Sequence, residues 1–121
     1  MSKRILVIED QEDNRRIVRD LFTSVGYDIF EAVDGHEGVA LAATHMPDLI
    51  LMDIQLPGID GYEATRQIKA NPALQHIPII AVTSYALSGD DVKAYEAGCN
   101  GYVSKPFSPR ALLAKVREFL P

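Results

Sequence analysis

The sequence is poor in cysteine and histidine, which excludes several kinds of stabilising and catalytic site. Its 121 residues include one cysteine, Cys99, so an internal disulfide is impossible and a reducing compartment suits the chain. The three histidines and this cysteine are widely spaced and do not form a zinc-binding pattern. A chain of this length buries enough apolar surface to fold without such crosslinks. We therefore expect one domain over residues 1–121.

Long apolar runs and an excess of basic residues are also missing. No run approaches the ~20 residues that span a bilayer. The first run, residues 5–8, is shorter than the ~7–15 residues of a signal-peptide core. We therefore expect a cytoplasmic protein that does not contact a membrane. The formal charge is −5, from 12 basic and 17 acidic residues, which disfavours a surface for nucleic acid.

The chain instead shows a regular alternation of strand-like and helix-like segments. Residues 5–8, 49–52 and 79–82 are continuous apolar runs, typical of strands that are buried on both faces of a parallel sheet. Two more polar runs, 27–32 and 101–104, suit edge strands. Five β–α pairs predict a doubly wound α/β fold with a five-stranded parallel sheet and five helices. The expected strand order, 2-1-3-4-5, is taken from known doubly wound sheets with this arrangement of central and edge strands.

The expected helices carry recognisable start signals. Asp34 and Asp60 each precede a glutamate by three residues, as in a capping box, and Ser108 precedes a proline. Ser88 and Asp91 form a similar start for the fourth helix. The buried sides of the first and second helices are expected to consist, respectively, of Ile17, Val18, Leu21, Phe22 and Val25, and of Val39, Ala42, Ala43 and Met46.

Polar residues follow four of the expected strands, at the edge of the sheet where doubly wound proteins bind ligands. Carboxylates that lie close together repel one another unless protons or a cation neutralise them, and oxygen ligands favour Mg²⁺. An Mg²⁺ ion, a lysine and a hydroxyl group suit phosphoryl transfer, in which one carboxylate can be the nucleophile. The residues at these strand ends are Glu9 and Asp10, Asp53, Thr83 and Ser84, and Lys105.

Asp53 is the expected acceptor among the three carboxylates. It ends a buried strand, so the sheet fixes its position. Glu9 and Asp10 are adjacent at a strand-to-helix turn, which suits them better to holding a metal ion.

These residues, in this order, resemble the motifs of response-regulator receiver domains, the CheY-like and flavodoxin-like fold of two-component signalling. The resemblance covers the whole chain, and residues 47–57 are similar to those of stand-alone regulators of the DivK type. It implies that Asp53 accepts a phosphoryl group from a phosphohistidine on a histidine kinase or a histidine phosphotransfer protein. It also implies that Asp10, Asp53 and the backbone carbonyl of Gln55 bind Mg²⁺, and that Glu9 holds a water on the metal.

The resemblance implies further roles at the other strand ends. Lys105 would pair with the phosphoryl oxygens, and its peptide bond to Pro106 is expected to be cis. Thr83 and Tyr102 would form a switch between the phosphorylation site and a protein-binding face. That face would consist of the fourth helix, the fifth strand and the fifth helix.

Three residues are expected to govern access to the phosphoryl group. Ser84 is small and would leave the path open, whereas Gln55 and Tyr85 would line the path of attacking water and influence the phosphoryl lifetime. Such a protein would not be an enzyme beyond self-phosphorylation from a donor and slow autodephosphorylation. Its partners would be the phosphodonor and a downstream protein target.

Other functions fit parts of the sequence less well. A dinucleotide-binding domain needs a glycine-rich loop after the first strand, where this chain is acidic, and no Walker A motif occurs. A phosphatase of the haloacid dehalogenase class also uses Mg²⁺ and an aspartyl nucleophile, but it has a second acid where this chain has Gln55. A structural pseudo-receiver would tend to lose Asp53 or Lys105. A receiver module cut from a hybrid histidine kinase is the alternative to a stand-alone regulator.

Overall fold

A five-stranded parallel sheet runs through the middle of the molecule. The computed structural model describes residues 2–83, 90–105 and 108–121. The strand order is β2-β1-β3-β4-β5, and all four pairings are parallel, which confirms the predicted topology and edge positions. The strands are β1 (Arg4–Ile8), β2 (Asp28–Ala32), β3 (Leu49–Asp53), β4 (Ile79–Thr83) and β5 (Gly101–Ser104).

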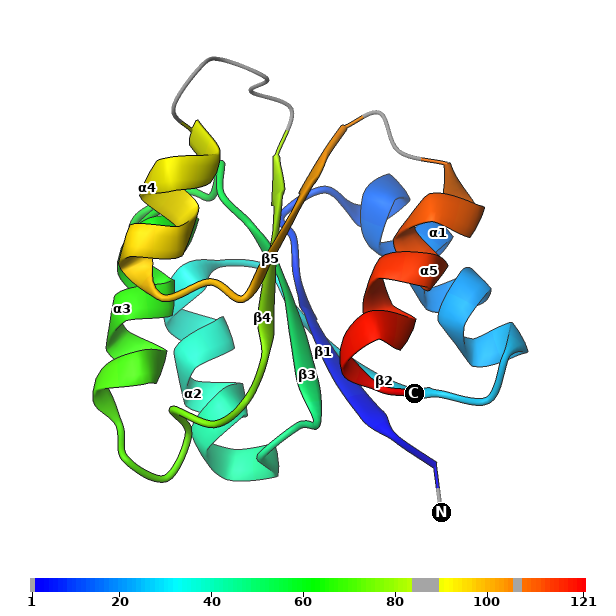
Figure 1. Ribbon diagram of the computed structural model, residues 1–121, viewed down its shortest axis with the longest axis horizontal. Coiled ribbons are helices and arrows are strands. Elements are labelled where there is room, and N and C mark those ends of the chain that lie inside the picture. The colour runs from blue at the N-terminus through cyan, green and yellow to red at the C-terminus, as the bar shows by residue number, and fades with distance from the viewer. Residues whose placement is uncertain (1, 84–89, 106–107) are drawn as a thin grey trace.

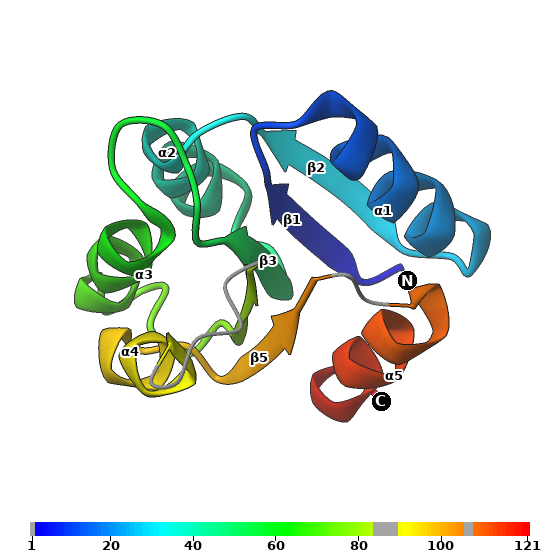
Figure 2. The same ribbon diagram turned by 90° about the horizontal axis from the view of Figure 1, so that it is seen from above.

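Helices cover both faces of the sheet, as predicted. Figure 1 and Figure 2 show α1 and α5 on one face, and α2, α3 and α4 on the other. None of the helices in the described part of the chain has the length and apolarity needed to cross a membrane. The helices are α1 (Glu12–Ser24), α2 (Gly35–His45), α3 (Gly61–Ala70), α4 (Asp90–Ala97) and α5 (Pro109–Phe119).

Each face of the sheet buries its own apolar core. Side chains alternate along a strand, so Ile50 and Met52 of β3 face α2–α4, whereas Leu49 and Leu51 face α1 and α5. Phe22 of α1 belongs to this second core and is fully buried. Burial of each large apolar side chain contributes roughly 1.5–3 kcal/mol, so the central strands are firmly fixed.

Three of the predicted helix caps are present. The side chains of Asp34, Asp60 and Ser108 each accept a hydrogen bond from the backbone amide three residues later, at 2.8, 2.9 and 3.0 Å. Ser88, the fourth expected cap residue, lies outside the described residues.

Gly61 at the start of α3 brings this helix against the end of β3. Its amide donates to the carbonyl oxygen of Ile54 at 2.9 Å. A Cβ atom at this position would overlap the carbonyl oxygen of Asp53 and lie 2.6 Å from Ile54 Cα. The backbone around Asp53 is therefore held by direct contact with a helix start that only glycine allows.

The predicted buried side of α1 is partly wrong. Ile17 and Val25 are 54% and 42% exposed, whereas Val18 and Phe22 are buried as predicted. The inward stripe of the helix runs instead through Arg15, Val18 and Phe22, at spacings of three and four residues. A buried arginine occupies a position that an apolar pattern does not assign to the core.

The predicted buried side of α2 also needs correction. Ala43 and Met46 are exposed, and the buried residues are Gly35, Gly38 and Ala42. A Cβ atom at Gly38 would lie 2.8 Å from Ile8 Cγ1, so the glycine lets α2 pack directly on β1. The pattern of apolar residues does not identify this face of α2, because its glycines have no apolar side chain.

Candidate functional site

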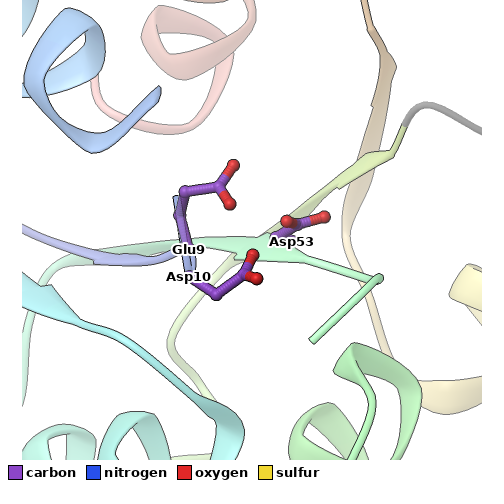
Figure 3. A group of neighbouring side chains, drawn as sticks. All are labelled: Glu9, Asp10 and Asp53. Atoms are coloured by element: carbon purple, nitrogen blue, oxygen red, sulfur yellow. The ribbon is translucent and has the colours of Figure 1, made fainter. Parts of the chain in front are cut away.

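Three carboxyl groups meet at the carboxyl ends of the neighbouring strands β1 and β3. Oxygen atoms of Glu9, Asp10 and Asp53 all lie within 4.8 Å of one another, and Figure 3 shows the three groups side by side. Glu9 and Asp53 are each 5% exposed, and Asp10 is half-buried. The structure thus brings together all three acids that the sequence analysis selected.

Lys105, from the segment after β5, joins this cluster across 96 residues of sequence. Its Nζ donates to Glu9 Oε1 at 2.8 Å and lies 3.5 Å from Asp53 Oδ2. Its backbone amide donates to the carbonyl oxygen of Thr83 at 2.6 Å, which holds the segment against the end of β4. One ammonium group therefore contacts two of the three carboxyl groups directly.

The two buried carboxyl groups have opposite pKa shifts. Burial, followed by the hydrogen bond and the negative charge of Glu9, raises the pKa of Asp53 to about 7. Burial also acts to raise the pKa of Glu9, but the hydrogen bonds from Lys105 and with Asp53 outweigh it and leave this pKa below its usual value. For Lys105, burial opposes the charged form, but the hydrogen bond to Glu9 and the charge of Asp53 raise the pKa. Asp53 therefore binds a proton more readily than Glu9 does.

Backbone hydrogen bonds fix the loops that carry the acids. The amide of Gln11 donates to Glu9 Oε2 at 3.1 Å, and the amide of Gln55 donates to Asp53 Oδ1 at 3.2 Å. The side-chain amide of Gln11 also donates to Asp10 Oδ2 at 3.2 Å. Asp53 Oδ2 faces Lys105 while Oδ1 is held by the backbone, so the orientation of this carboxyl group is defined at both oxygens.

The predicted switch residues lie on the two strands beyond β3. Thr83 is fully buried at the end of β4, where it pairs with Ser104 of β5. Tyr102 of β5 is half-buried and pairs with Ala81. The other predicted site residues, Ser84, Tyr85 and Pro106, lie outside the described residues, so their roles and the cis peptide bond stay predictions.

A cavity of about 690 Å³ opens beside the cluster, between α1, α5 and the sheet. Glu9, Asp53 and Lys105 line its polar end, and apolar side chains such as Val18 and Leu112 line the remainder. The cavity therefore gives access to the carboxyl group of Asp53 beside the ammonium group of Lys105.

Sequence reasoning missed one residue at this site, the buried Arg15 of α1. Its Nη1 donates to the backbone carbonyl oxygen of Glu9 at 2.8 Å. Its spacing could have indicated burial, because residue 15 lies three and seven positions before Val18 and Phe22, which places it on the same side of the helix as these core residues. A charged residue at such a position indicates a buried polar contact, but the sequence does not identify the partner.

The donor set fits a hard divalent cation, and we expect Mg²⁺ to stabilise the chain. Three clustered carboxyl oxygens are ligands that Mg²⁺ prefers. At 100 times the Kd, binding would add about 2.7 kcal/mol to the free energy of unfolding. Because the cation competes with the proton on Asp53, binding should be tighter at pH 8 than at pH 6.

Thermal unfolding over a range of Mg²⁺ concentrations measures this effect. Asp10→Ala should remove most of the response, whereas Asp13→Ala, which removes an exposed carboxylate nearby, should retain it. An unchanged response in Asp10→Ala would mean that Asp10 is not a ligand.

Comparisons with known proteins agree over nearly the whole chain. The sequence model of the response regulator receiver domain matches residues 5–117. The polar-differentiation response regulator DivK of Brucella abortus (strain 2308) is 42% identical over 120 residues, covering 99% of this chain and 98% of DivK.

Solved structures show the same fold. The chemotaxis response regulator CheY4 of Vibrio cholerae superposes with a TM-score of 0.93 at 24% identity, covering 98% of this chain and 99% of CheY4. The receiver domain of the sensor histidine kinase PA1611 from Pseudomonas aeruginosa has a TM-score of 0.92 at 37% identity, covering 99% of this chain and 98% of that one. That structure holds a magnesium ion in its active-site cleft.

Proposed function

Because this chain belongs to the response regulator receiver domain family, we propose that Asp53 is its phosphoacceptor and that Mg²⁺ assists the transfer. The observation that carries this proposal is the position of Asp53. It ends a buried central strand, with Glu9 and Asp10 within 4.8 Å and the ammonium group of Lys105 at 3.5 Å. The donor would be a phosphohistidine of a histidine kinase or a phosphotransfer protein, since receiver domains in general interact with phosphodonors and downstream targets.

The metal would be held by Asp10, Asp53 and the backbone carbonyl of Gln55, with Glu9 orienting a water in its coordination shell. Mg²⁺ would neutralise the acceptor carboxylate and the oxygens of the transferring group. The raised pKa of Asp53 supports this assignment, because a cation that displaces the proton leaves the carboxylate charged and nucleophilic.

In the proposed transfer, a carboxylate oxygen of Asp53 attacks the phosphorus atom. A P–O bond forms, the P–N bond to the donor imidazole breaks, and the imidazole nitrogen takes up a proton. Lys105, which faces both carboxyl groups in the free chain, would pair with the oxygens of the acyl phosphate. The chain would thus take up and slowly lose a phosphoryl group rather than turn over a substrate.

Asp53→Asn is expected to abolish phosphorylation, because it retains the shape of the acceptor and removes the nucleophile. The chain and the variant are incubated with acetyl phosphate and Mg²⁺, and their intact masses are measured. Asp13→Asn, the same substitution at an exposed acid, should be phosphorylated like the unmodified chain. A phosphate adduct on Asp53→Asn would show that another residue is the acceptor.

Phosphorylation would be transmitted through Thr83 and Tyr102 to the face formed by α4, β5 and α5. The pairing of β4 with β5 supports this route, since it places Tyr102 one strand beyond Thr83 and in contact with the core under α4. Val92 and Tyr95 of α4 are exposed, which suits this face to contact a partner.

Thr83→Ala should still accept phosphate but weaken the response of Tyr102. The hydroxyl group is lost while the strand end and the acceptor are retained. The measurement is the NMR shift of Tyr102 on phosphorylation. A response as large as that of the unmodified chain would exclude this coupling.

A further inference from the structure

Arg15 is a charged residue in the core-facing stripe of α1, and its guanidinium group contacts three polar partners. Its side chain is only 10% exposed. Nη1 donates to the carbonyl oxygen of Glu9 at 2.8 Å, Nε lies 3.3 Å from Glu31 Oε1, and Nη2 contacts the carboxylate of Glu12. Burial of a guanidinium group is costly unless such partners are present, so this arrangement is specific.

The hydrogen bond from Arg15 is one of two that hold the backbone of Glu9 in place. The amide of Glu9 donates to the carbonyl oxygen of Ala32 at 3.0 Å, which extends the pairing of β1 with β2 by one residue. Arg15 binds the carbonyl on the other side of the same residue. Both backbone polar groups of Glu9 are therefore occupied, and its carboxylate is left to face Lys105 and Asp53.

Glu31 holds the guanidinium group in this orientation from the edge strand β2. Its carboxylate contacts Arg15 Nε and also accepts from Arg19 Nη1 at 2.9 and 3.0 Å. Glu31 pairs with Val7 in the sheet, so its position is fixed relative to the end of β1. The chain of contacts thus runs from β2, through Arg15, to the peptide that precedes Asp10.

We propose that Arg15, oriented by Glu31, is a positioning residue that fixes the turn between β1 and α1 so that Glu9 and Asp10 face Asp53. This inference rests on the proposed function for its effect on Mg²⁺. Its structural part, the fixation of the turn, concerns the metal-free chain as well. The planar fork of arginine is required, because one group must reach a carbonyl oxygen and a carboxylate in different directions.

A simpler role for Arg15 would be a salt bridge that stabilises α1 alone. Arg16 makes such a contact, because it lies 3.4 Å from Asp13 one turn earlier, and both side chains are exposed. Exposed pairs of this kind contribute little. Arg16→Met is therefore the matched control, since it removes a neighbouring arginine of the same helix with its ion pair.

The first test compares the Mg²⁺ affinities of Arg15→Met, Arg15→Lys and Arg16→Met by amide NMR titration. We expect Arg15→Met to weaken binding about tenfold or more, the usual effect of losing a group that orients a metal ligand. Arg15→Lys should not restore the affinity, although it retains the charge. An affinity in Arg15→Met within about twofold of that in Arg16→Met would overturn the proposal.

The second test uses the metal-free chain, so that it does not depend on the proposed function. Hydrogen exchange of the amides of Glu9 and Gln11 is expected to be about tenfold faster in Arg15→Met and in Glu31→Gln than in Arg16→Met.

If Arg15→Met does not fold, the exchange rates of Glu31→Gln alone test the proposal, because this variant retains the arginine and only weakens its orientation. Unchanged exchange of both amides in Glu31→Gln and in any folded Arg15→Met would overturn the proposal. If exchange is faster but the unmodified chain shows no Mg²⁺ response, the positioning role stands and the proposed metal site fails.

Discussion

Asp53→Asn is expected to stabilise the metal-free chain at pH 8 by roughly 2–4 kcal/mol. Asp53 is almost fully buried, and burial with the neighbouring Glu9 raises its pKa to about 7 from the ordinary value of 3.8. The folded chain therefore keeps a proton on Asp53 at pH values where the unfolded chain has lost it. Folding becomes less favourable by about 1.4 kcal/mol for each pH unit across that window, from about pH 4 to pH 7.

Asparagine removes this pH dependence because it is neutral throughout. Urea unfolding in EDTA at pH 5 and pH 8 measures the effect, and the advantage of Asp53→Asn over the unmodified chain should be larger at pH 8. Asp13→Asn should change the free energy of unfolding by less than about 0.5 kcal/mol at either pH. A variant that is no more stable than the unmodified chain at pH 8, or an advantage that does not shrink toward pH 5, would contradict the assigned pKa.

The same substitution is thus expected to abolish phosphorylation and to increase stability. Asp53 is held in an environment that disfavours its own charged form, and Mg²⁺ or a proton would offset this. The opposite signs separate loss of the nucleophile from loss of the fold. A variant that fails to take up phosphate because it is unfolded would instead show a lower free energy of unfolding than the unmodified chain.

The sheet could be predicted from sequence because its central and edge strands differ in composition. Residues 49–52 are apolar throughout, whereas residues 27–32 are mixed, and the structure buries the first set fully and the second only partly. The acids could be placed because parallel strands all end at one edge, and because the strand order of known doubly wound sheets puts β1 beside β3, which brings Asp10 and Asp53 together.

The helix faces were less predictable, because apolar spacing alone does not fix the rotation of a helix. In α2 the inward face is made by Gly38 and Ala42, whose side chains carry little hydrophobic signal, and Met46 is exposed. In α1 the inward face includes Arg15, whose partner Glu31 lies on another element. Contacts that join a helix to a strand depend on packing geometry, which the sequence does not encode locally.

The sequence also could not predict which of the two buried carboxyl groups binds a proton more readily. Glu9 and Asp53 are both carboxyl groups at strand ends, and the sequence gives no reason to expect opposite shifts. Burial acts to raise both pKa values, but Lys105 Nζ lies 2.8 Å from Glu9 and 3.5 Å from Asp53, so the ammonium group stabilises the charge of Glu9 more strongly. The hydrogen bond and the charge of Glu9 then raise the pKa of Asp53 further.

Lys105→Met is expected to destabilise the metal-free chain at pH 8 by roughly 2–4 kcal/mol, since it leaves two buried carboxyl groups without their cation. Methionine retains most of the side-chain volume and removes the charge. The contact with Glu9 and Asp53 raises the pKa of Lys105 in the folded chain, so deprotonation of the lysine itself removes its stabilising effect only above the ordinary lysine pKa of 10.5. At pH 5 the loss should be smaller, because a proton shared by the two carboxyl groups replaces part of the missing charge.

A double variant separates this electrostatic cause from a loss of packing. In the Asp53→Asn background one of the two carboxyl charges is gone, so Lys105→Met should cost at least about 1 kcal/mol less than it does alone. Lys115→Met, which removes the partner of Glu118 at 3.3 Å on α5, serves as the control and should have an effect below about 1 kcal/mol. Equal costs of Lys105→Met in both backgrounds would show that the side chain acts through packing.

If the costs differ as expected, Mg²⁺ should restore more stability to Lys105→Met than it adds to the unmodified chain, because the cation then neutralises charges that the lysine no longer offsets.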